Sequence, residues 1–270
     1  SPKWKNLVVL KFTDYVQKEE FLELVLDDSL GRNISAIVHM GACSSTVQED
    51  ADYLLRNNYK YSIILAQYAL KNKIRMIYAS SGATYGAGER GYSDNQEQLE
   101  SLRPLNRYGY SKHLFDLWAC RSNHLERLAG LKFFNVFGPN EYHKGEMRSM
   151  VAKAFDQIHA TGKIRLFKSN VPGLADGEQK RDFVYIKDCV EVLLWFIRNP
   201  QVNGIFNVGS GKARSWNDLA QAIFSALGKN PEVEYFDMPE ALSRQYQNFT
   251  QAETEKLRKA GFQNNLFSLE

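Results

Sequence analysis

The chain has 270 residues, of which 44% are hydrophobic and 24% are charged, and its formal net charge is +3. This composition excludes a largely disordered chain, and the length suffices for one large domain or for a large and a smaller domain. The small net charge, with no dense block of Lys or Arg, gives no indication of binding to nucleic acid or to a membrane surface, and no apolar run approaches the ~20 residues of a membrane span.

Cysteine and histidine usage points to neither disulfides nor metal. The cysteines Cys43, Cys120 and Cys189 are scattered, form no C-x-x-C pair and follow no signal segment. This usage is typical of a reducing compartment, so we expect a cytoplasmic protein. The five histidines show no metal-ligand spacing, and no metal site is expected.

Apolar runs and amphipathic stretches alternate along the first half of the chain. Short apolar runs predict buried strands at residues 7–12, 35–40, 75–79 and 131–137. Between them, helical periodicity predicts helices at 17–26, 49–72 and 108–128. Strands and helices in alternation favour an α/β fold with a doubly wound (Rossmann) parallel sheet.

The regular alternation of predicted strands and helices ends after residue 139. Further helices are predicted at 147–161, 187–198 and 215–227, with a strand at 204–208 and a surface loop at 170–179. We therefore expect a dinucleotide-binding Rossmann domain formed by residues 1–139 and 179–210. A smaller α/β domain that binds the substrate would comprise residues 140–178 and 211–270.

Small residues follow two of the predicted strands, at residues 41–46 and 80–86. Ligands of doubly wound sheets lie beyond the carboxyl ends of the strands, so these segments are candidates for a binding site. Residues 86–91 match G-x-G-x-x-G, but no helix follows them directly, and a mobile loop within the polar stretch 87–106 is predicted instead. A true phosphate-binding turn should precede these strand ends, so we expect that an N-terminal βαβ portion of roughly 30 residues is missing, together with the residue that distinguishes NAD from NADP.

Tyr108 and Lys112 lie four residues apart at the start of a predicted helix, and such residues share a face. The phenol has an unperturbed pKa of about 10, and a nearby ammonium favours its ionised form. Such a pair can move protons on an alcohol. Taken alone, the pair is explained equally by a packed aromatic ring and a solvated lysine.

Five motifs in order, at residues 39–42, 80–86, 108–112, 134–139 and 181–185, resemble the extended short-chain dehydrogenase/reductase family. Within it, residues 41–46, 78–81, 135–145 and 244–252 are similar to the epimerases that act on ADP-glycero-manno-heptose. The resemblance covers nearly the whole chain. It implies an enzyme of lipopolysaccharide inner-core heptose biosynthesis that inverts C6″ of the sugar, by transient oxidation to a ketone and reduction on the opposite face. The implied cofactor is NADP, with NAD as the alternative.

The resemblance also implies catalytic roles. Tyr108 would be the catalytic phenol, Lys112 its electrostatic partner, and Ser81 a hydrogen-bond donor to the reacting oxygen. Lowering the phenol pKa from about 10 to near 7 takes roughly 4 kcal/mol, which Lys112 and an oxidised nicotinamide would jointly supply. Lys144 would be a second acid or base, although a lysine at such a position is by itself an ordinary solvated loop residue.

Cofactor and substrate residues follow by position. The implied cofactor set is Met40, Gly41, Ala42, Cys43, Ser44, Asn57, Val136, Lys18, Lys112 and Lys144. The implied substrate set is Ser81, Asn135, Glu146, Lys153, Phe167, Arg181 and Tyr246. A guanidinium suits a pyrophosphate, although Arg181 would also suit an ordinary ion pair. Without a binding role, Phe167 and Tyr246 would be core residues, and Asn57 would be an ordinary exposed residue. Lys153 and Glu146 depart from the histidine and the small polar residue of that family.

Three alternatives share parts of this pattern. A UDP-sugar 4-epimerase shares the core residues but gives no role to Lys144. A nucleotide-sugar 4,6-dehydratase carries Asp-Glu after the active-site hydroxyl, where this chain has Gly82 and Ala83. A dinucleotide-sensing protein without turnover usually lacks the tyrosine. The family further suggests a homo-oligomer, specifically a pentamer, with an ADP-sugar as substrate.

Overall fold

Four parallel strands form the central sheet of the structure, a computed structural model that describes residues 2–30 and 33–263. Their order is β1 (Ala36–His39), β2 (Arg75–Ser81), β3 (Leu128–Phe133) and β7 (Gly204–Val208). The register of β2 on β3 runs unbroken from Met76 opposite Leu128 to Ser81 opposite Phe133. The predicted Rossmann-like parallel sheet is confirmed.

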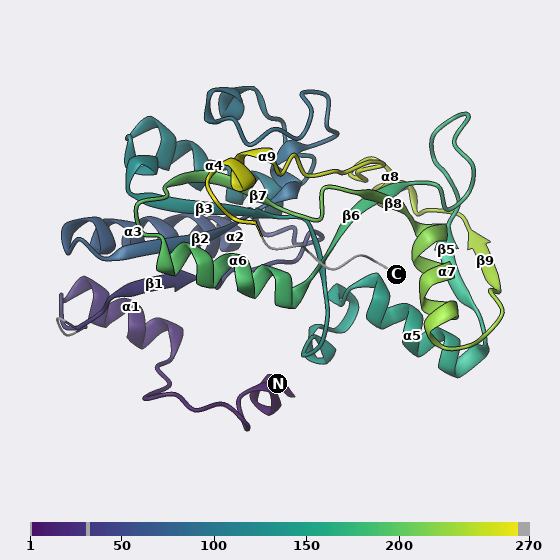
Figure 1. Cartoon of the computed structure of the whole chain (residues 1–270), viewed down its shortest axis with the longest axis horizontal. Helices are drawn as coiled ribbons and strands as arrows, with labels where there is room; N and C mark the ends of the chain where they lie inside the picture. The colour runs from purple at the N-terminus through teal and green to yellow at the C-terminus, as the bar shows by residue number, and fades with distance from the viewer. Residues whose placement is uncertain (1, 31–32, 264–270) are drawn as a thin grey trace.

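Helices cover both faces of this sheet. Side chains of a strand alternate between its faces, so apolar residues of one strand can pack against helices on both sides. Met76 and Tyr78 of β2 pack in one apolar cluster with the helices on one side, while Ile77 packs in another with the helix on the opposite side. The first group of helices is α1 (Lys18–Leu26), α3 (Tyr61–Lys71) and α4 (Arg107–Arg121). The opposite face is covered by α6 (Ile186–Arg198), in front of the sheet in Figure 1, and by the short α9 (Glu255–Lys259).

A third apolar cluster lies at the far end of the molecule (Figure 1). It joins α5 (Met150–Thr161) and α7 (Trp216–Ala226) to a two-stranded parallel sheet of β5 (Ile164–Phe167) and β9 (Val233–Phe236). A three-stranded sheet connects the two regions and comprises β4 (Asn135–Phe137), β6 (Lys180–Tyr185) and β8 (Ala213–Ser215). A short helix, α8 (Glu240–Ser243), follows β9. The domain boundaries given above stay a prediction.

The predicted helix at 49–72 contains a π-helical interruption. It consists of α2 (Ala51–Leu54), the π segment η2 (Leu55–Lys60) and α3. Asn57 and Asn58 lie in this segment, which explains why they break the apolar pattern. Such bulges are often found at functional sites, and here the bulge carries a buried amide, that of Asn58.

The predicted buried strand at residues 7–12 is wrong. A short 3-10 helix, η1 (Pro2–Asn6), precedes this region, residues 7–9 form a turn, and Val9 is 86% exposed. A short apolar run becomes a buried strand only when a neighbour supplies ladder hydrogen bonds and covering side chains. Within the described chain no strand pairs with it.

Two other predicted boundaries differ from the structure. The helix predicted to end at 128 ends at Arg121, because Asn123 adopts a left-handed conformation with φ of 55°. A 3-10 turn, η5 (His124–Glu126), leads into β3. The strand predicted at 131–137 is divided at Phe134, whose amide donates to Val208 O (3.0 Å), while β4 pairs with β6 instead.

The polar stretch 87–106, predicted to contain a mobile loop, is packed against the core. Tyr92, Leu99 and Leu102 are buried, and a 3-10 helix, η4 (Gln96–Ser101), lies within it. No helix begins directly after Gly91, since η4 starts only at Gln96, so the match to G-x-G-x-x-G does not lead into a helix.

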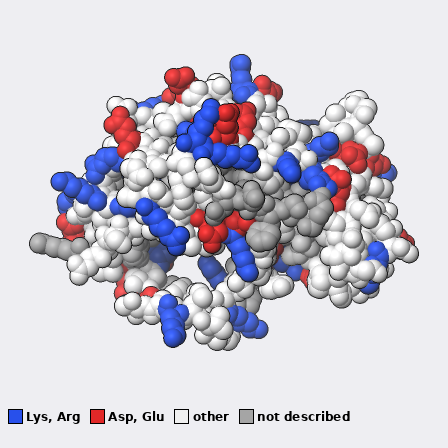
Figure 2. All heavy atoms as spheres, in the orientation of Figure 1, with Lys and Arg blue, Asp and Glu red and all other residues white. Residues whose placement is uncertain are grey.

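Basic and acidic side chains are interspersed on the face seen in Figure 2. Over the described residues, no helix combines the length and apolarity that crossing a bilayer requires. The same residues contain no cluster of three or more His, Cys, Asp or Glu side chains able to hold a metal ion.

Candidate active site

Ser81 ends β2 and begins the 3-10 turn η3 (Gly82–Tyr85). Its Oγ accepts a hydrogen bond from Ala83 N (3.1 Å), and its carbonyl accepts one from Thr84 Oγ1 (2.8 Å). A hydroxyl that accepts a backbone amide still has its own proton to donate. The turn therefore fixes Ser81 and leaves its hydroxyl available as a donor.

Tyr108 lies in the first turn of α4, close to the Ser81 turn. Asn106 caps the helix by accepting from Gly109 N (2.8 Å). A Cβ on Gly109 would lie 2.8 Å from Ala83 O, so only glycine lets the helix approach the turn this closely. The close contact between Gly109 and Ala83 therefore brings the start of α4, with Tyr108, next to the turn that carries Ser81.

Burial raises the pKa of the Tyr108 phenol above its ordinary value of 10.0, and a hydrogen bond with the Ser81 side chain lowers it. A smaller contribution, from Cys43, raises the pKa further. The net direction is opposite to the lowering expected from the sequence, because burial outweighs the hydrogen bond. Lys112 does not contribute to this shift.

Lys112 is 4% exposed, and its Nζ donates to Ala79 O of β2 (2.8 Å). Burial lowers the pKa of its ammonium to about 8, while the Asp116 carboxylate opposes that shift. The side chain is therefore a buried cation held at the carboxyl end of the strand that carries Ser81.

The chain beyond β1 forms an open segment beside these groups. Met40, Gly41, Ala42 and Ser44 are exposed, and a Cβ on Gly41 would meet no atom within 4 Å. The buried Asn58 of η2 fixes the segment, accepting from Cys43 N (2.8 Å) and donating to Cys43 O (2.9 Å). The same amide group donates to Ser111 Oγ (2.9 Å), one residue before Lys112. The predicted cofactor segment is thus tied directly to α4.

Two other predicted cofactor residues also meet. The Nζ of Lys18 on α1 donates to Oδ1 of Asn57 on η2 (2.8 Å). Val136 lies on β4 and packs partly against the apolar cluster of α6. The ammonium of Lys18, the amide of Asn57 and the open backbone at Gly41 offer hydrogen-bond donors and close approach beyond a strand end. These residues fit a nicotinamide dinucleotide.

Three predicted substrate residues come together at the third apolar cluster. Arg181 is 6% exposed, and its guanidinium lies 4.7 Å from the ring centroid of Tyr246 and 5.5 Å from that of Trp216. Trp216 Nε1 donates to Tyr246 OH (2.8 Å), and Phe167 meets Tyr246 edge to face at 6.3 Å. Among the described residues Arg181 has no carboxylate partner; it donates to Lys180 O (2.8 Å). The guanidinium of Arg181, packed between aromatic rings, therefore has N–H donors available for an anion.

The remaining predicted residues lie on β4, η6 (Tyr142–Met147) and α5. Lys153 and Glu146 form an ion pair of 3.0 Å, and Asn135 is half-buried on β4. Lys144 is exposed on η6. Across residues 2–30 and 33–263, no hydrogen bond or ion pair joins the Lys144 ammonium to Tyr108 or Lys112.

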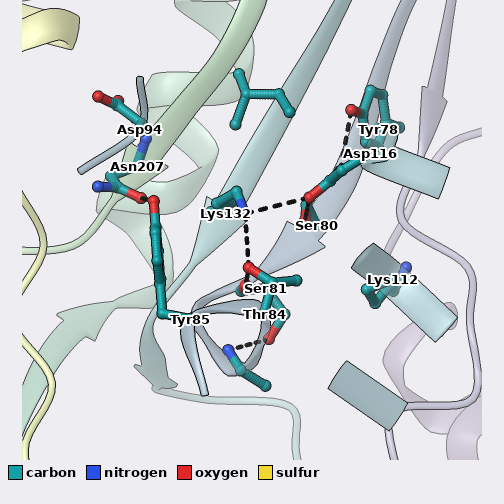
Figure 3. Close-up of polar contacts among 12 residues, drawn as sticks. Tyr78, Ser80, Ser81, Thr84, Tyr85, Asp94, Lys112, Asp116, Lys132 and Asn207 are labelled. Carbon is teal, nitrogen blue, oxygen red and sulfur yellow. Dashed lines mark hydrogen bonds and ion pairs between the residues drawn. The ribbon is translucent and has the colours of Figure 1, made fainter. Parts of the chain in front are cut away.

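A buried ion pair behind the site escaped the sequence analysis. Lys132 Nζ lies 3.3 Å from Asp116 Oδ2, and Lys132 also donates to Thr84 Oγ1 at 2.6 Å (Figure 3). Two signals could have revealed the pair: a lysine inside an otherwise apolar strand, and a carboxylate one helical turn after Lys112.

Comparisons with known proteins agree with this geometry. Residues 13–209 match the model of the NAD dependent epimerase/dehydratase family. An ADP-L-glycero-D-manno-heptose-6-epimerase of Nitratidesulfovibrio vulgaris is 55% identical over 97% of this chain and 81% of its own length. One from Fusobacterium nucleatum is 46% identical over 99% of this chain and 83% of its length. The crystal structure of the Helicobacter pylori ADP-L-glycero-D-manno-heptose-6-epimerase superposes with a TM-score of 0.78 at 29% identity, covering 94% of this chain and 74% of that one.

Proposed function

Because this chain belongs to the NAD dependent epimerase/dehydratase family, and within it to the ADP-L-glycero-D-manno-heptose-6-epimerases, we propose that it inverts C6″ of ADP-glycero-manno-heptose for the inner core of lipopolysaccharide. The structural observation that carries the chemistry is the packing of the first turn of α4, which bears Tyr108, against the turn after β2, which bears Ser81: a Cβ on Gly109 would lie 2.8 Å from Ala83 O. This arrangement places a proton acceptor and a donor on one reacting oxygen.

Inversion at a secondary alcohol begins with removal of its hydroxyl proton, so a base must lie within hydrogen-bond reach of the oxygen. Tyr108 takes that proton, and Ser81 donates to the same oxygen. A bound nicotinamide dinucleotide supplies the acceptor and donor of the hydride. Lys18, Asn57, Lys112 and the segment 40–44 hold the dinucleotide, because they offer donors beside the carboxyl ends of β1 and β2.

A second proton-transfer group explains how the opposite configuration arises. The hydride must return to the other face of the ketone, so the sugar oxygen is presented in a second orientation. We assign the proton donor of that orientation to Lys144, whose exposure on η6 leaves its ammonium available. Lys153 and Glu146 lie near it in the chain and pair with each other.

Recognition of the nucleotide is assigned to the third apolar cluster. Arg181 donates to the pyrophosphate, and the rings of Phe167 and Tyr246 contact the nucleotide, since a buried guanidinium clasped by aromatic rings binds an anion with its free N–H donors. Asn135 and Val136 lie on β4, between the two regions.

Three finer features are proposed on the same basis. The cofactor is NADP, for which Lys18 offers an exposed ammonium to a phosphate. The subunits form a homo-oligomer, and the two domains divide at residues 139, 178 and 210. Fluorescence titration with each reduced dinucleotide tests the first, and light scattering tests the second.

One NMR experiment tests the function. The protein with its dinucleotide is mixed separately with an ADP-glycero-manno-heptose and with a UDP-hexose. Inversion of C6″ in the first and no change in the second is the expected result. Inversion at C4 of the UDP-hexose with an unchanged heptose would establish the 4-epimerase alternative.

A further inference from the structure

Asp116 of α4 and Lys132 of β3 form an ion pair directly behind the proposed site. Their charged atoms lie 3.3 Å apart, and both side chains are 0% exposed. Apolar residues of similar volume often replace such a pair without loss of stability, because burial of two charges is costly. A structural role alone is therefore a weak explanation for this pair.

Lys132 connects to the turn that carries Ser81. Its Nζ donates to Thr84 Oγ1 (2.6 Å), and Thr84 Oγ1 donates to the Ser81 carbonyl (2.8 Å). The same ammonium lies 4.6 Å from the ring centroid of Tyr85, the last residue of η3. Figure 3 shows Lys132 between Asp116 and this turn. One buried cation thus contacts the end of the turn at Thr84 and Tyr85 and reaches the Ser81 carbonyl through Thr84.

Asp116 connects to the strand and to Lys112. Its carboxylate accepts from Ser80 Oγ (2.6 Å) and from Tyr78 OH (3.1 Å), on two residues of β2. Lys112, one helical turn earlier, donates to the carbonyl of Ala79, between those two. The carboxylate and the ammonium therefore hold consecutive residues of one strand, immediately before Ser81.

We propose that Asp116 and Lys132 are positioning residues for the epimerisation, with Lys132 setting the Ser81 hydroxyl through Thr84 and Asp116 holding the Lys112 ammonium in place and in its charged form. This inference rests on the roles proposed above for Ser81 and Lys112. Neither residue of the pair touches the reacting atoms.

The charge environment supports the Asp116 part of the inference. The titratable groups that face Asp116 come from four elements: Lys112, His113 and Cys120 on α4, Tyr78 on β2, Lys132 on β3 and Tyr85 on η3. Lys112 in turn faces Asp116 and, from β1, His39, whose pKa is about 4, so that it is neutral near pH 7. Asp116 is therefore the carboxylate that offsets the burial of Lys112.

A kinetic double-mutant cycle tests the Lys132 part. Lys132→Met is expected to lower the turnover number about tenfold or more, and to have little further effect in a Ser81→Ala background, because residues that act as a unit are not additive. Lys256→Met is the matched control. That ammonium also lies over an aromatic ring, 4.8 Å from the centroid of Phe206, and donates to Ile205 O (2.7 Å), but it has no link to Ser81. Its effect is expected to be the same in both backgrounds.

The Asp116 part has a readout independent of turnover. NMR of protein labelled with ¹³C at lysine Cε follows the titration of Lys112, whose resonance is assigned by its loss in Lys112→Arg. The titration near pH 8 is expected to move to lower pH in Asp116→Asn and to stay in place in Lys256→Met. A merely structural role of Asp116 would leave the titration where it is.

The double variant Asp116→Asn/Lys132→Met keeps the volume and removes both charges of the pair, so it remains informative if a single variant unfolds. Full turnover of the folded double variant would overturn the inference, as would multiplicative effects of Lys132→Met and Ser81→Ala. If Ser81→Ala and Lys112→Met themselves retained turnover, the proposed catalytic roles would fail and this inference with them. Loss of turnover in those two with multiplicative effects of Lys132→Met would overturn the positioning role alone.

Discussion

The Tyr108 phenol is the residue on which the proposed chemistry depends, and its surroundings act against ionisation. Burial raises its pKa, and the hydrogen bond with Ser81 recovers only part of that shift. A phenol in this state is a strong base once ionised but is mostly protonated near pH 7. Because Lys112 does not contribute to this shift, the positive charge that favours ionisation must come from an oxidised dinucleotide.

Tyr108→Phe and Lys144→Ala test the two proton-transfer assignments. Each is expected to reduce C6″ inversion by about 10²- to 10⁴-fold, the usual contribution of general acid–base catalysis, while the dinucleotide stays bound. Turnover is measured by NMR, and cofactor retention by absorbance. Tyr110→Phe and Lys229→Ala, exposed residues outside the site, serve as controls. Normal turnover in Tyr108→Phe and Lys144→Ala would remove both assignments.

The Lys112 ammonium predicts an alkaline limit of activity. Its pKa of about 8 means that the cation is lost as pH rises through that value, and with it the charged donor that we propose to hold the dinucleotide. The turnover number at saturating substrate is therefore expected to fall above about pH 8. A profile that stays flat up to the ordinary lysine pKa of about 10.5 would contradict this expectation.

At this scale the sequence predicted the groups to which we assign the reaction, but not the groups that support them. Tyr108, Lys112 and Ser81 belong to short ordered motifs. The partnership of Asp116 and Lys132 depends on how α4 crosses β3, which is a property of the fold. The contact between Asn58 and Cys43 also depends on the fold, because it joins the π segment to the chain that follows β1.

Among the elements, α4 matters most for the geometry of the proposed site, because its first turn packs on the turn after β2. Gly109 makes this contact possible. A Cβ there would lie 2.8 Å from Ala83 O, so the helix or the turn must shift. The Ser81 hydroxyl and the Tyr108 phenol belong to the two elements that would separate.

Gly109→Ala is expected to destabilise the protein by about 1–3 kcal/mol, the usual cost of overpacking, and to reduce turnover more than the loss of stability explains. Thermal unfolding and turnover at a temperature well below the midpoint separate the two effects. Tyr110→Ala, at the exposed neighbouring position, is the control. Unchanged turnover in Gly109→Ala would show that the close approach does not position the site.

Element boundaries from the sequence failed where tertiary pairing decides them. The periodic helices at 17–26 and 187–198 agree with α1 and α6 to within one residue. The apolar run at 7–12 and the strand that divides at Phe134 could not be predicted, since both depend on which strand lies alongside. The short strands β5 and β9 pair across almost seventy residues of chain and carry little pattern of their own.

For the whole molecule, the proposed site depends on the central sheet, because its residues follow the carboxyl ends of the strands. A buried histidine at one of these strand ends makes the stability of the fold depend on pH. His39 ends β1, and its Nε2 lies 2.8 Å from Ser62 Oγ of α3. Burial lowers its pKa from 6.5 to about 4. Below pH 6.5 the unfolded chain therefore binds a proton that the native protein excludes.

This linkage predicts acid lability with a definite sign. As pH falls from 6.5 to about 4, the free energy of unfolding is expected to decrease by roughly 3 kcal/mol through His39, at about 1.4 kcal/mol per pKa unit. Urea unfolding at a series of pH values measures this change. His39→Asn should reduce the slope over that interval without abolishing it, because burial also lowers the pKa of His113 to about 4. The same slope in variant and wild type would contradict the assignment to His39.

The most direct test of the redox inversion follows the hydrogen on C6″. The enzyme, with its dinucleotide, converts ADP-glycero-manno-heptose in deuterated water, and the product is analysed by NMR. If inversion proceeds by transient oxidation, the hydrogen removed from C6″ returns to the same carbon on the opposite face, so the product carries protium there. Deuterium at C6″ of the product would mean that the carbon exchanges a proton with solvent, and would contradict oxidation and reduction at this site.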